Sequence, residues 1–247
     1  MKKRVIIDNR MRKIEKEKLR SLGYELVEIK KSNHVYPEIS SHVDIFTCKI
    51  DDQIVIEESQ YDNIVKKINR KNIIKGEYRL SEKYPYDISY NVCTIGNKAI
   101  HNFKYTEPKI YNLLLEKDFE CIEVKQGYSN CSIAVIDNKS IILSDKGLYN
   151  SLKNKDLDIL FLDDEYDIKL LNENGNYSLK TGFIGGAIAR VENNIIIFGD
   201  LDKIDKRKQI RKFIEKKGLN IIEFKGLDVI DYGGIAIINW ILCKYMV

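Results

Sequence analysis

The chain has 247 residues, of which 44% are hydrophobic and 32% charged, and its net charge is +4. This length and composition exclude a disordered chain and allow a substantial buried core. The densest basic run, "DKRKQIRKFIEKK" (205–217), carries apolar residues at helical spacing, so we interpret it as the solvated face of a helix and expect no nucleic-acid partner.

The start of the chain, "MKKRVIIDNR", has three apolar residues before Asp8, too few for the apolar part of a signal peptide, and no apolar run approaches a membrane span. The five cysteines are an odd number without CxxC spacing, and there are three histidines. We therefore expect free thiols in a cytoplasmic protein, no membrane partner, no metal and no cofactor. The sequence leaves the oligomeric state open.

Four stretches share an apolar strand, a two-residue polar turn and a second apolar strand. In chain order they are "IFTCKIDDQIVIEE", "NVCTIGNKAIHNF", "SIAVIDNKSIILSD" and "AIARVENNIIIFGD". The predicted turns are Asp51-Asp52, Gly96-Asn97, Asp137-Asn138 and Glu192-Asn193. Pairs such as Gly-Asn and Asp-Asn tolerate the positive φ that tight hairpin turns need.

A charged amphipathic helix followed by a strand also recurs. The stretches "KLRSLGYELVEIK", "NLLLEKDFECIEVK" and "FIEKKGLNIIEFK" align without gaps and place Glu28, Glu123 and Glu223 at one position. Gly23 and Gly218 match the residue expected just past a helix end. Weaker copies at "IVKKINRKNIIK" and before "DLDILFLDD" bring the number of helix–strand units to five.

The fifth hairpin is incomplete near the C-terminus. "YGGIAIINW" (232–240) supplies its first strand, and the N-terminal "RVIIDNR" resembles the second strands of the other hairpins. We predict that the N-terminal strand completes this repeat and closes a ring, which removes exposed strand edges; the alternative is that "ILCKYMV" forms the strand. The fold expected is α/β, with five ββαβ-like repeats in a single domain over residues 1–247.

The repeats divide the cysteines into two kinds. Cys48 and Cys93 stand three residues before their turns, where the other hairpins carry alanine, so we expect both to be small core residues. Cys121 aligns with aliphatic residues of the other helix–strand units and is expected in the core. The position of Cys243, in the apolar stretch at the C-terminus, predicts no role for it. Cys131 lies six residues before its turn, at the junction where a loop enters the strand.

His42 and Asp44 of "SSHVDIF" occupy the equivalent junction of the first repeat, two residues apart and so on one side of an extended chain. Since such junctions would converge at the centre of the ring, Cys131, His42 and Asp44 are predicted to meet in one pocket. A nearby cation or imidazolium lowers the pKa of a thiol. The thiolate would then attack an electrophilic carbon while His42 shuttles protons and Asp44 holds a cationic group.

These features resemble the penteins, the five-bladed β/α propellers of the guanidino-group-modifying superfamily. That superfamily includes arginine and agmatine deiminases, dimethylarginine hydrolases and amidinotransferases. "SSHVDIF" resembles its histidine motif GHxD, "SYNVCTIGNKAI" the following blade of agmatine deiminases, and "GYSNCSIAV" the loop that leads into the nucleophilic cysteine. The two motifs stand two blades apart, as in the family, but the cysteine blade comes third rather than last, which implies circular permutation.

The resemblance implies a hydrolase or amidinotransferase that acts on a small cationic guanidino compound. By this resemblance Cys131 is the nucleophile, His42 the general acid/base and Asp44 a ligand of the guanidinium nitrogens. Asn91 and Asn130, which lie in the motifs quoted above, are further substrate-binding candidates.

The chain departs from the family where a Glu or Asp is expected before a Gly-Gly pair. Here that place belongs to Tyr232, and Asp231 one residue earlier is the candidate carboxylate. The glycines of "GFIGG" and "DYGG" fit no phosphate-binding pattern, so we expect them to allow close backbone packing at the centre of the ring. The alternative function is a catalytically silent pentein that binds a protein or ligand, as the ribosome anti-association factor of archaea and eukaryotes uses the fold without catalysis.

Overall fold

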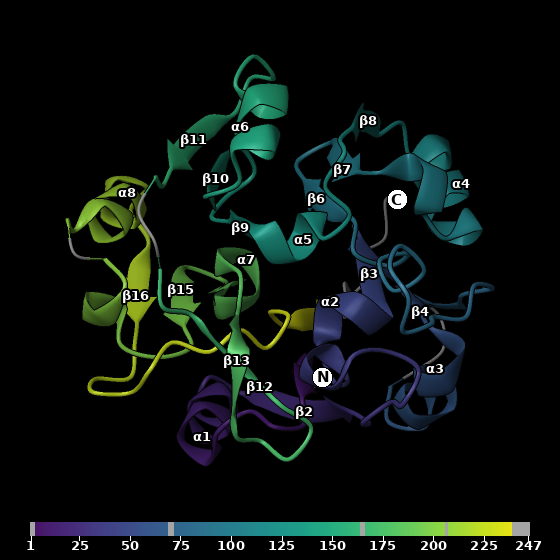
Figure 1. The fold of residues 1–247 in the computed structure, drawn as a ribbon, viewed down its shortest axis with the longest axis horizontal. Coiled ribbons are helices and arrows are strands. Elements are labelled where there is room, and N and C mark those ends of the chain that lie inside the picture. The colour runs from purple at the N-terminus through teal and green to yellow at the C-terminus, as the bar shows by residue number, and fades with distance from the viewer. Residues whose placement is uncertain (1–2, 69–71, 164–165, 206, 239–247) are drawn as a thin grey trace, which may run out of the picture.

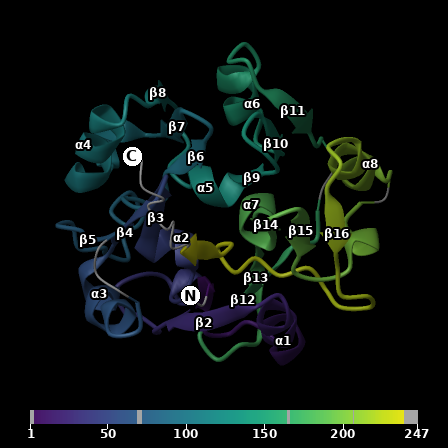
Figure 2. The ribbon, with the colours of Figure 1, turned by 180° about the vertical axis from the view of Figure 1, so that it is seen from behind.

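The computed structural model describes residues 3–68, 72–163, 166–205 and 207–238. Within these ranges the strands form five three-stranded sheets and one two-stranded sheet. The five larger sheets surround a centre that holds three short helices, and the longer helices stand on the outside (Figure 1). The same arrangement is seen from behind in Figure 2. The α/β class predicted from the sequence is confirmed.

Each three-stranded sheet has one topology: an antiparallel strand pair, a crossing helix, and a third strand parallel to the second. Parallel neighbours need a crossover connection, which the helix provides. The five units are β17 (Ala236–Ile238), β1 (Lys3–Asp8), α1 (Lys13–Ser21) and β2 (Tyr24–Ile29); β3 (Thr47–Ile50), β4 (Gln53–Ile56), α3 (Glu58–Val65) and β5 (Ile73–Lys75); β6 (Cys93–Ile95), β7 (Lys98–His101), α4 (Pro108–Glu116) and β8 (Glu120–Glu123); β9 (Ile133–Val135), β10 (Ser140–Leu143), α6 (Lys146–Leu152) and β11 (Asp158–Phe161); and β14 (Ile188–Val191), β15 (Asn194–Ile197), α8 (Gln209–Lys216) and β16 (Asn220–Ile222).

Shorter elements connect these units. The one-turn helices at the centre are α2 (Val43–Phe46), α5 (Ser129–Ser132) and α7 (Ile184–Ala187). The 3-10 turns are η1 (Pro37–Ile39), η3 (Phe103–Tyr105) and η4 (Leu201–Lys203), and the remaining sheet is the hairpin of β12 (Lys169–Leu171) and β13 (Tyr177–Thr181).

Three of the four predicted hairpin turns have the expected length, and their first residues take a positive φ: 52° at Asp51, 55° at Gly96 and 56° at Glu192. The prediction of a two-residue turn at Asp137-Asn138 is wrong. There the loop is one residue longer, because Ile136 N–H donates to Ser140 O at 2.8 Å and the Asp137 carboxylate accepts the N–H of Lys139 at 2.8 Å. The aspartate side chain thus stabilises its own turn.

The helix–strand units end as the sequence predicts. Gly23 follows α1 with a φ of 88°, and Gly218 follows α8 with a φ of 70°, a left-handed conformation that glycine adopts without steric cost. Helix α8 buries Ile210 and Ile214, so the basic run around it is the solvated face of an amphipathic helix. No helix in the described ranges has the length and apolar character needed to cross a membrane.

The first and the last strand of the described structure lie in one sheet. Strand β1 lies between β17 and β2, with Val5 opposite Ile237 on its antiparallel side and Leu26 on its parallel side. This is the pairing predicted for the N-terminal strand. None of the described sheets closes on itself. The alternative strand "ILCKYMV" (241–247) lies outside the described residues.

The cysteines lie largely where the repeats place them. Cys48 and Cys93 are buried in the core, as predicted. Cys121 on β8 packs against the core as a partly buried residue at its margin. Cys243 lies outside the described residues.

A buried ion pair joins β1 to the β12–β13 hairpin. The fully buried carboxylate of Asp8 contacts Arg10 Nη2 at 2.6 Å. The same guanidinium donates to Leu171 O and to Glu38 O, both at 2.9 Å. Arg10 therefore neutralises Asp8 and holds two connecting segments against the end of the N-terminal strand.

We expect Arg10→Ala to lower the free energy of unfolding by about 3–5 kcal/mol, because it leaves Asp8 charged, buried and unpaired. Lys13→Ala is the matched control, since Lys13 forms an exposed pair with Glu17 at 3.7 Å and should cost no more than about 0.5 kcal/mol. Urea denaturation at pH 7 measures both. Equal losses in the two variants would contradict the role given to Arg10.

Candidate active site

The predicted site residues come from four segments at the centre of the molecule. His42 precedes α2 and Asp44 lies within it, while Cys131 lies in α5. Asn91 lies near the end of the connection between β5 and β6, and Asp231 lies in the segment before β17. All five are buried, none more than 2% exposed.

Residues 43–46 form a helical turn, so the expectation that His42 and Asp44 lie along an extended chain is wrong, although the two side chains still share one neighbour. That neighbour is Gly233, with a φ of 67°. A Cβ added there would lie 2.7 Å from His42 Cβ and closer still to Asp44 Oδ1. Gly186 likewise has no room for a Cβ beside Asp231. The glycines of both motifs thus allow close backbone packing, as predicted.

Cys131 is held by Asp44 and Asn91. Its Sγ lies 2.9 Å from Asp44 Oδ2, so the thiol donates its hydrogen to that carboxylate. The Asn91 side chain donates from Nδ2 to the sulfur at 3.1 Å and accepts the Cys131 N–H at its Oδ1 at 3.2 Å. The structure therefore brings the predicted thiol and carboxylate into direct contact and adds an amide that fixes the cysteine's backbone.

His42 and Asp231 form the other half of the group. His42 Nδ1 lies 3.8 Å from Asp231 Oδ1, an ion-pair distance beyond hydrogen bonding. Asp231 is oriented by the N–H groups of Phe183 and Gly233, each 2.8 Å from a carboxylate oxygen. Asp231 thus stands beside the imidazole, although Tyr232 occupies the place at which the family motif carries an acid.

Several buried polar atoms of this group have no hydrogen-bond partner within the described part of the chain. They include both ring nitrogens of His42 and the second carboxylate oxygen of Asp44, Oδ1. Leaving buried polar atoms unpaired costs free energy, which is commonly tolerated where a ligand completes the bonding. Here the atoms without a partner are a carboxylate oxygen of Asp44, which can accept a hydrogen bond, and the two ring nitrogens of His42.

The carboxylates are strongly perturbed. Burial raises the pKa of Asp44 to about 6, although its bonds from Cys131 and Asn91 oppose the rise. Burial and then the charge of Asp44 raise the pKa of Asp231 to about 7. Both acids would ionise more readily with a bound cation beside them.

The resting thiol is protonated. Burial, followed by the charges of Asp44 and Asp231, raises the pKa of Cys131 well above its ordinary value. Burial and then the nearby Arg10 lower the pKa of His42 well below its ordinary value, so the imidazole is neutral. The expectation of a thiolate stabilised by an imidazolium is wrong for the unliganded protein, because burial and then the carboxylates disfavour ionisation of the thiol, and the ring carries no charge.

Asn130 enters the site through its backbone. Its N–H donates to Asn91 Oδ1 at 2.8 Å and to Asn91 O at 3.2 Å. Its side chain forms no hydrogen bond with Cys131 or Asp44 in the described part of the chain. The structure therefore supports Asn91, but not the Asn130 side chain, as a direct neighbour of the sulfur.

Sequence reasoning did not identify Asp87, Tyr128 or His101 as parts of this region. The Tyr128 hydroxyl donates to Asp87 Oδ2, and Tyr128 lies one helical turn before Cys131. His101 contacts Thr106 Oγ1 at 2.7 Å and Gly127 O at 3.0 Å, which anchors the loop leading to the cysteine. Asp87 lies four residues before Asn91 in "DISYN", the only local hint.

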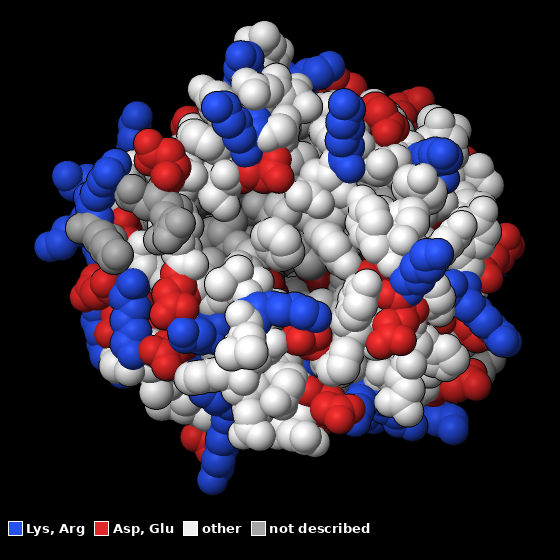
Figure 3. Space-filling model, in the orientation of Figure 1, with Lys and Arg blue, Asp and Glu red and all other residues white. Residues whose placement is uncertain are grey.

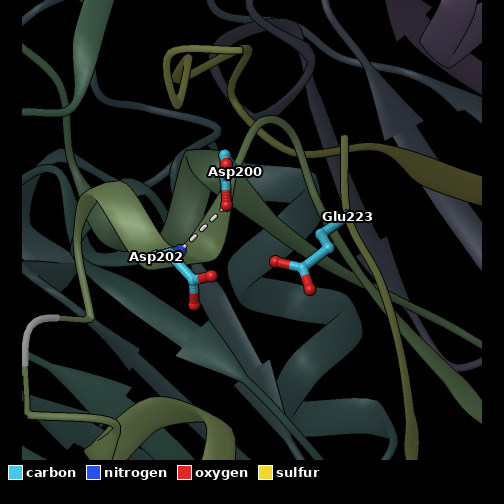
Figure 4. A group of neighbouring side chains, drawn as sticks. All are labelled: Asp200, Asp202 and Glu223. Carbon is cyan, nitrogen blue, oxygen red and sulfur yellow. Dashed lines mark hydrogen bonds between the residues drawn. The ribbon is translucent and has the colours of Figure 1, made fainter. Parts of the chain in front are cut away.

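A separate carboxylate cluster, Asp200, Asp202 and Glu223, has oxygens close enough together to hold a metal ion (Figure 4). Lys225 Nζ, however, lies within 2.7–3.3 Å of all three side chains. Arg211 also pairs with Asp202 and Glu223, both at 3.0 Å. Two side-chain cations therefore already pair with the three carboxylates of this cluster, and we assign no metal to it.

A sequence model described as a family of unknown function (DUF6873) matches residues 6–236 of the chain. Among curated proteins, none matches.

Solved structures of similar fold include a dimethylarginine dimethylaminohydrolase (DDAH) from Pseudomonas aeruginosa in complex with citrulline. It is 11% identical to this chain, covers 92% of each chain and has a TM-score of 0.56. The amidinotransferase SxtG from Microseira wollei is also 11% identical, with a TM-score of 0.52 over 92% of this chain and 88% of its own. Agmatine deiminase from C. jejuni is 14% identical, with a TM-score of 0.50 over 90% of this chain and 74% of its own. These likenesses confirm the predicted pentein fold.

We expect Asp44→Asn to lower the apparent pKa of the Cys131 thiol by at least about one pH unit, because it removes a negative charge that touches the sulfur. Alkylation of each cysteine, followed by mass spectrometry from pH 6 to 10, measures this change. Cys93 is the internal control, since burial alone raises its pKa. An unchanged profile for Cys131 would show that Asp44 does not control the thiol.

Proposed function

This chain belongs to the family of unknown function DUF6873, and we propose that it modifies a small cationic guanidino compound by cysteine chemistry. The observation that carries the proposal is the contact of 2.9 Å between Cys131 Sγ and Asp44 Oδ2. Beside it, Asp44 Oδ1 and the His42 ring nitrogens have no hydrogen-bond partner among the described residues. One carboxylate then holds the thiol with one oxygen and offers the other to the substrate.

A guanidinium suits this group in charge and shape. Its planar N–H groups match carboxylate oxygens and form charge-assisted hydrogen bonds. Asp44 and Asp231 are both buried without a lysine or arginine partner in the described ranges, so a bound cation offsets the cost of burying them. Asp44 Oδ1 belongs to the carboxylate whose other oxygen contacts Cys131. A guanidinium bound to Oδ1 would therefore have its carbon beside the sulfur.

The bound cation also activates the thiol. Its positive charge opposes the two carboxylates that raise the pKa of Cys131, so the thiolate becomes accessible only in the complex. The neutral His42 accepts the thiol proton. In this scheme the resting enzyme is protected from oxidation and alkylation, and the substrate generates its own nucleophile.

The reaction then proceeds in two steps. Cys131 sulfur forms a bond to the guanidinium carbon, and His42 returns the proton to the departing nitrogen as the C–N bond breaks, leaving an amidino group on the sulfur. In hydrolysis, His42 takes a proton from water, the new C–O bond forms, the C–S bond breaks and the thiol is restored. An amine in place of water gives amidino transfer.

The architecture proposed for this site is a five-bladed β/α propeller formed by one domain over residues 1–247. The five units of like topology around the central helices support it, as does the antiparallel pairing of β1 with β17, by which the N-terminal strand would close the ring. In such a propeller each blade contributes one connection to the centre. We place the protein in the cytoplasm because the chemistry needs a free thiol, and all four described cysteines are free.

A catalytically silent binding protein is the second candidate. The observation that favours it is the raised pKa of Cys131, together with the absence, in the described structure, of a hydrogen bond between that thiol and His42. In that case the buried carboxylates would bind a cationic ligand or partner group without bond cleavage.

We expect Cys131→Ala to reduce release of ammonia or amine from a guanidino substrate by at least about 10³-fold, because the amidino intermediate cannot form. Cys48→Ala is the matched control: it should retain activity and lose only stability, since Cys48 is a core residue. A panel of guanidino compounds, with intact-mass detection of an adduct on Cys131, provides the measurement. Binding without turnover or adduct would favour the silent protein.

We expect affinity for methylguanidine to rise at least tenfold between pH 5 and pH 8. Asp44 and Asp231 have pKa values raised to about 6 and about 7, so each is protonated at the acid end and becomes anionic as the pH rises through these values. Isothermal titration calorimetry on the wild-type protein measures the trend. An affinity that is constant or falls with pH would exclude these carboxylates as the guanidinium site.

A further inference from the structure

The outer strand of the β12–β13 hairpin has a free edge. The inner strand, β12, lies between β13 and the segment before β17: the Lys169 N–H donates to Val229 O at 2.8 Å, and Lys169 O accepts the Asp231 N–H at 2.9 Å. On its other side, β13 pairs with no strand of the described structure. Figure 1 shows the hairpin between α7 and β2. Strand β13 is therefore an edge strand, and its outer main-chain groups are open to pairing.

The ladder of the hairpin shows which main-chain groups point to this edge. The Gly182 N–H donates across the hairpin at 2.8 Å, and Asn176 O accepts an N–H from the opposite arm at 2.7 Å. Because bonded and non-bonded pairs alternate along an antiparallel ladder, the neighbouring Thr181 and Tyr177 direct their N–H and C=O groups away from β12. Between them the register shifts, so three residues of β13 centred on Leu179 lie opposite one residue of β12.

The two faces of β13 are the reverse of those of a usual surface hairpin. Its polar side chains face the body of the protein, where Ser178 and Lys180 contact Glu38 at 2.9 and 3.1 Å. Leu179 lies on the opposite face of the strand and is 106% exposed, and Tyr177 on the same face is 52% exposed. A hairpin normally turns its apolar face inward, so an apolar face in solvent indicates a partner.

Further apolar side chains adjoin this strand. Phe183, two residues after β13, is 38% exposed, and Tyr84 is 45% exposed. Both rings contact that of Tyr128, with centroids 6.2 and 6.0 Å apart. The middle of the face seen in Figure 3 is mostly free of charged side chains, while most lysines and arginines stand towards its edge. An apolar middle with a polar rim is the usual anatomy of a protein–protein interface.

The free edge of β13 is complementary to itself. In an antiparallel pair of β13 strands related by a two-fold axis at Leu179, this leucine meets its own copy. Tyr177 then lies opposite Thr181 of the second copy, and the reverse pair forms on the other side of the axis. The outward N–H and C=O groups of each strand thus face those of the other.

The remaining positions of this register are compatible with pairing. Lys180 lies opposite Ser178 and meets no like charge directly, and its ammonium group is already paired with Glu38. Phe183 lies opposite Gly175 of the second copy, which has no side chain to obstruct the ring. Edge strands are commonly protected from pairing by an unpaired lysine or a proline, and "YSLKT" has neither.

We propose that two copies of this chain pair through β13, antiparallel about a two-fold axis at Leu179, and form a four-stranded sheet from their hairpins. The contact is smaller than the about 800 Å² per partner of a standard interface, so the dimer is weak and reversible. It also fixes the segment leading to Phe183, whose N–H donates to Asp231 at 2.8 Å. The inference does not depend on the proposed function.

Sedimentation equilibrium of the full chain, from about 2 to about 200 µM, tests the proposal. We expect mostly monomer at the low end and mostly dimer at the high end. Leu179→Lys and Leu179→Glu should each raise the dissociation constant at least tenfold, because each places like charges opposite one another at the axis. An equimolar mixture of the two variants should dimerise again, since a lysine then faces a glutamate.

Leu115→Lys is the matched control, because Leu115 on α4 is also an exposed leucine, at 52%, and should leave the dissociation constant within about twofold. Leu179 is fully exposed, so its variants keep the fold, which circular dichroism confirms. A wild-type protein that stays monomeric at the highest concentration would overturn the pairing with a second copy. So would a dimer indifferent to Leu179→Lys, or a mixture of the two variants that remains monomeric.

Discussion

The centre of this protein depends on carboxylates that the fold buries without a lysine or arginine partner among the residues that the structure describes. Asp44 and Asp231 lie within a few ångströms of a thiol and an imidazole, where water is excluded and each isolated charge is costly. Packing this close to the carboxylates requires neighbouring residues without a Cβ atom, and Gly186 and Gly233 meet this requirement. The same close packing that makes burial of these carboxylates costly also orients them, so under the proposed function the site would be preorganised for a cation before one binds.

The repeated ββαβ unit explains how residues far apart in the chain come together. Each unit begins with a connection that approaches the centre, and in three of them the connection is a one-turn helix before the first strand. Cys131 and Asp44 occupy these turns in different units, and the hydrogen bonds of Asn91 join them through the unit between. The sheets are therefore the scaffold, and the chemistry depends on which residue stands at each turn.

Much of this arrangement could be predicted from the sequence because the repeats act as an internal alignment. Cys48 and Cys131 were separated by their distance from a turn. Both are buried, and Cys131 alone of the two contacts polar side chains in the described structure, those of Asp44 and Asn91. Asp87 was not found because the long connection from β5 to β6 has neither helical nor alternating periodicity. The contact between Asp87 and Tyr128 joins residues 41 positions apart, which no local pattern reports. The longer turn at Asp137 depends on a side-chain hydrogen bond, and composition alone does not reveal it.

The direction of the thiol's pKa is the most informative difference between sequence and structure. Residue types alone suggest that an imidazole beside a thiol gives a thiolate, but burial keeps His42 neutral while two carboxylates oppose ionisation of Cys131. A site built in this way has no reactive nucleophile until positive charge enters it. Under the proposed function, selectivity for a cationic substrate and activation of the thiol would have one cause, because the positive charge that the carboxylates bind would also let the sulfur ionise.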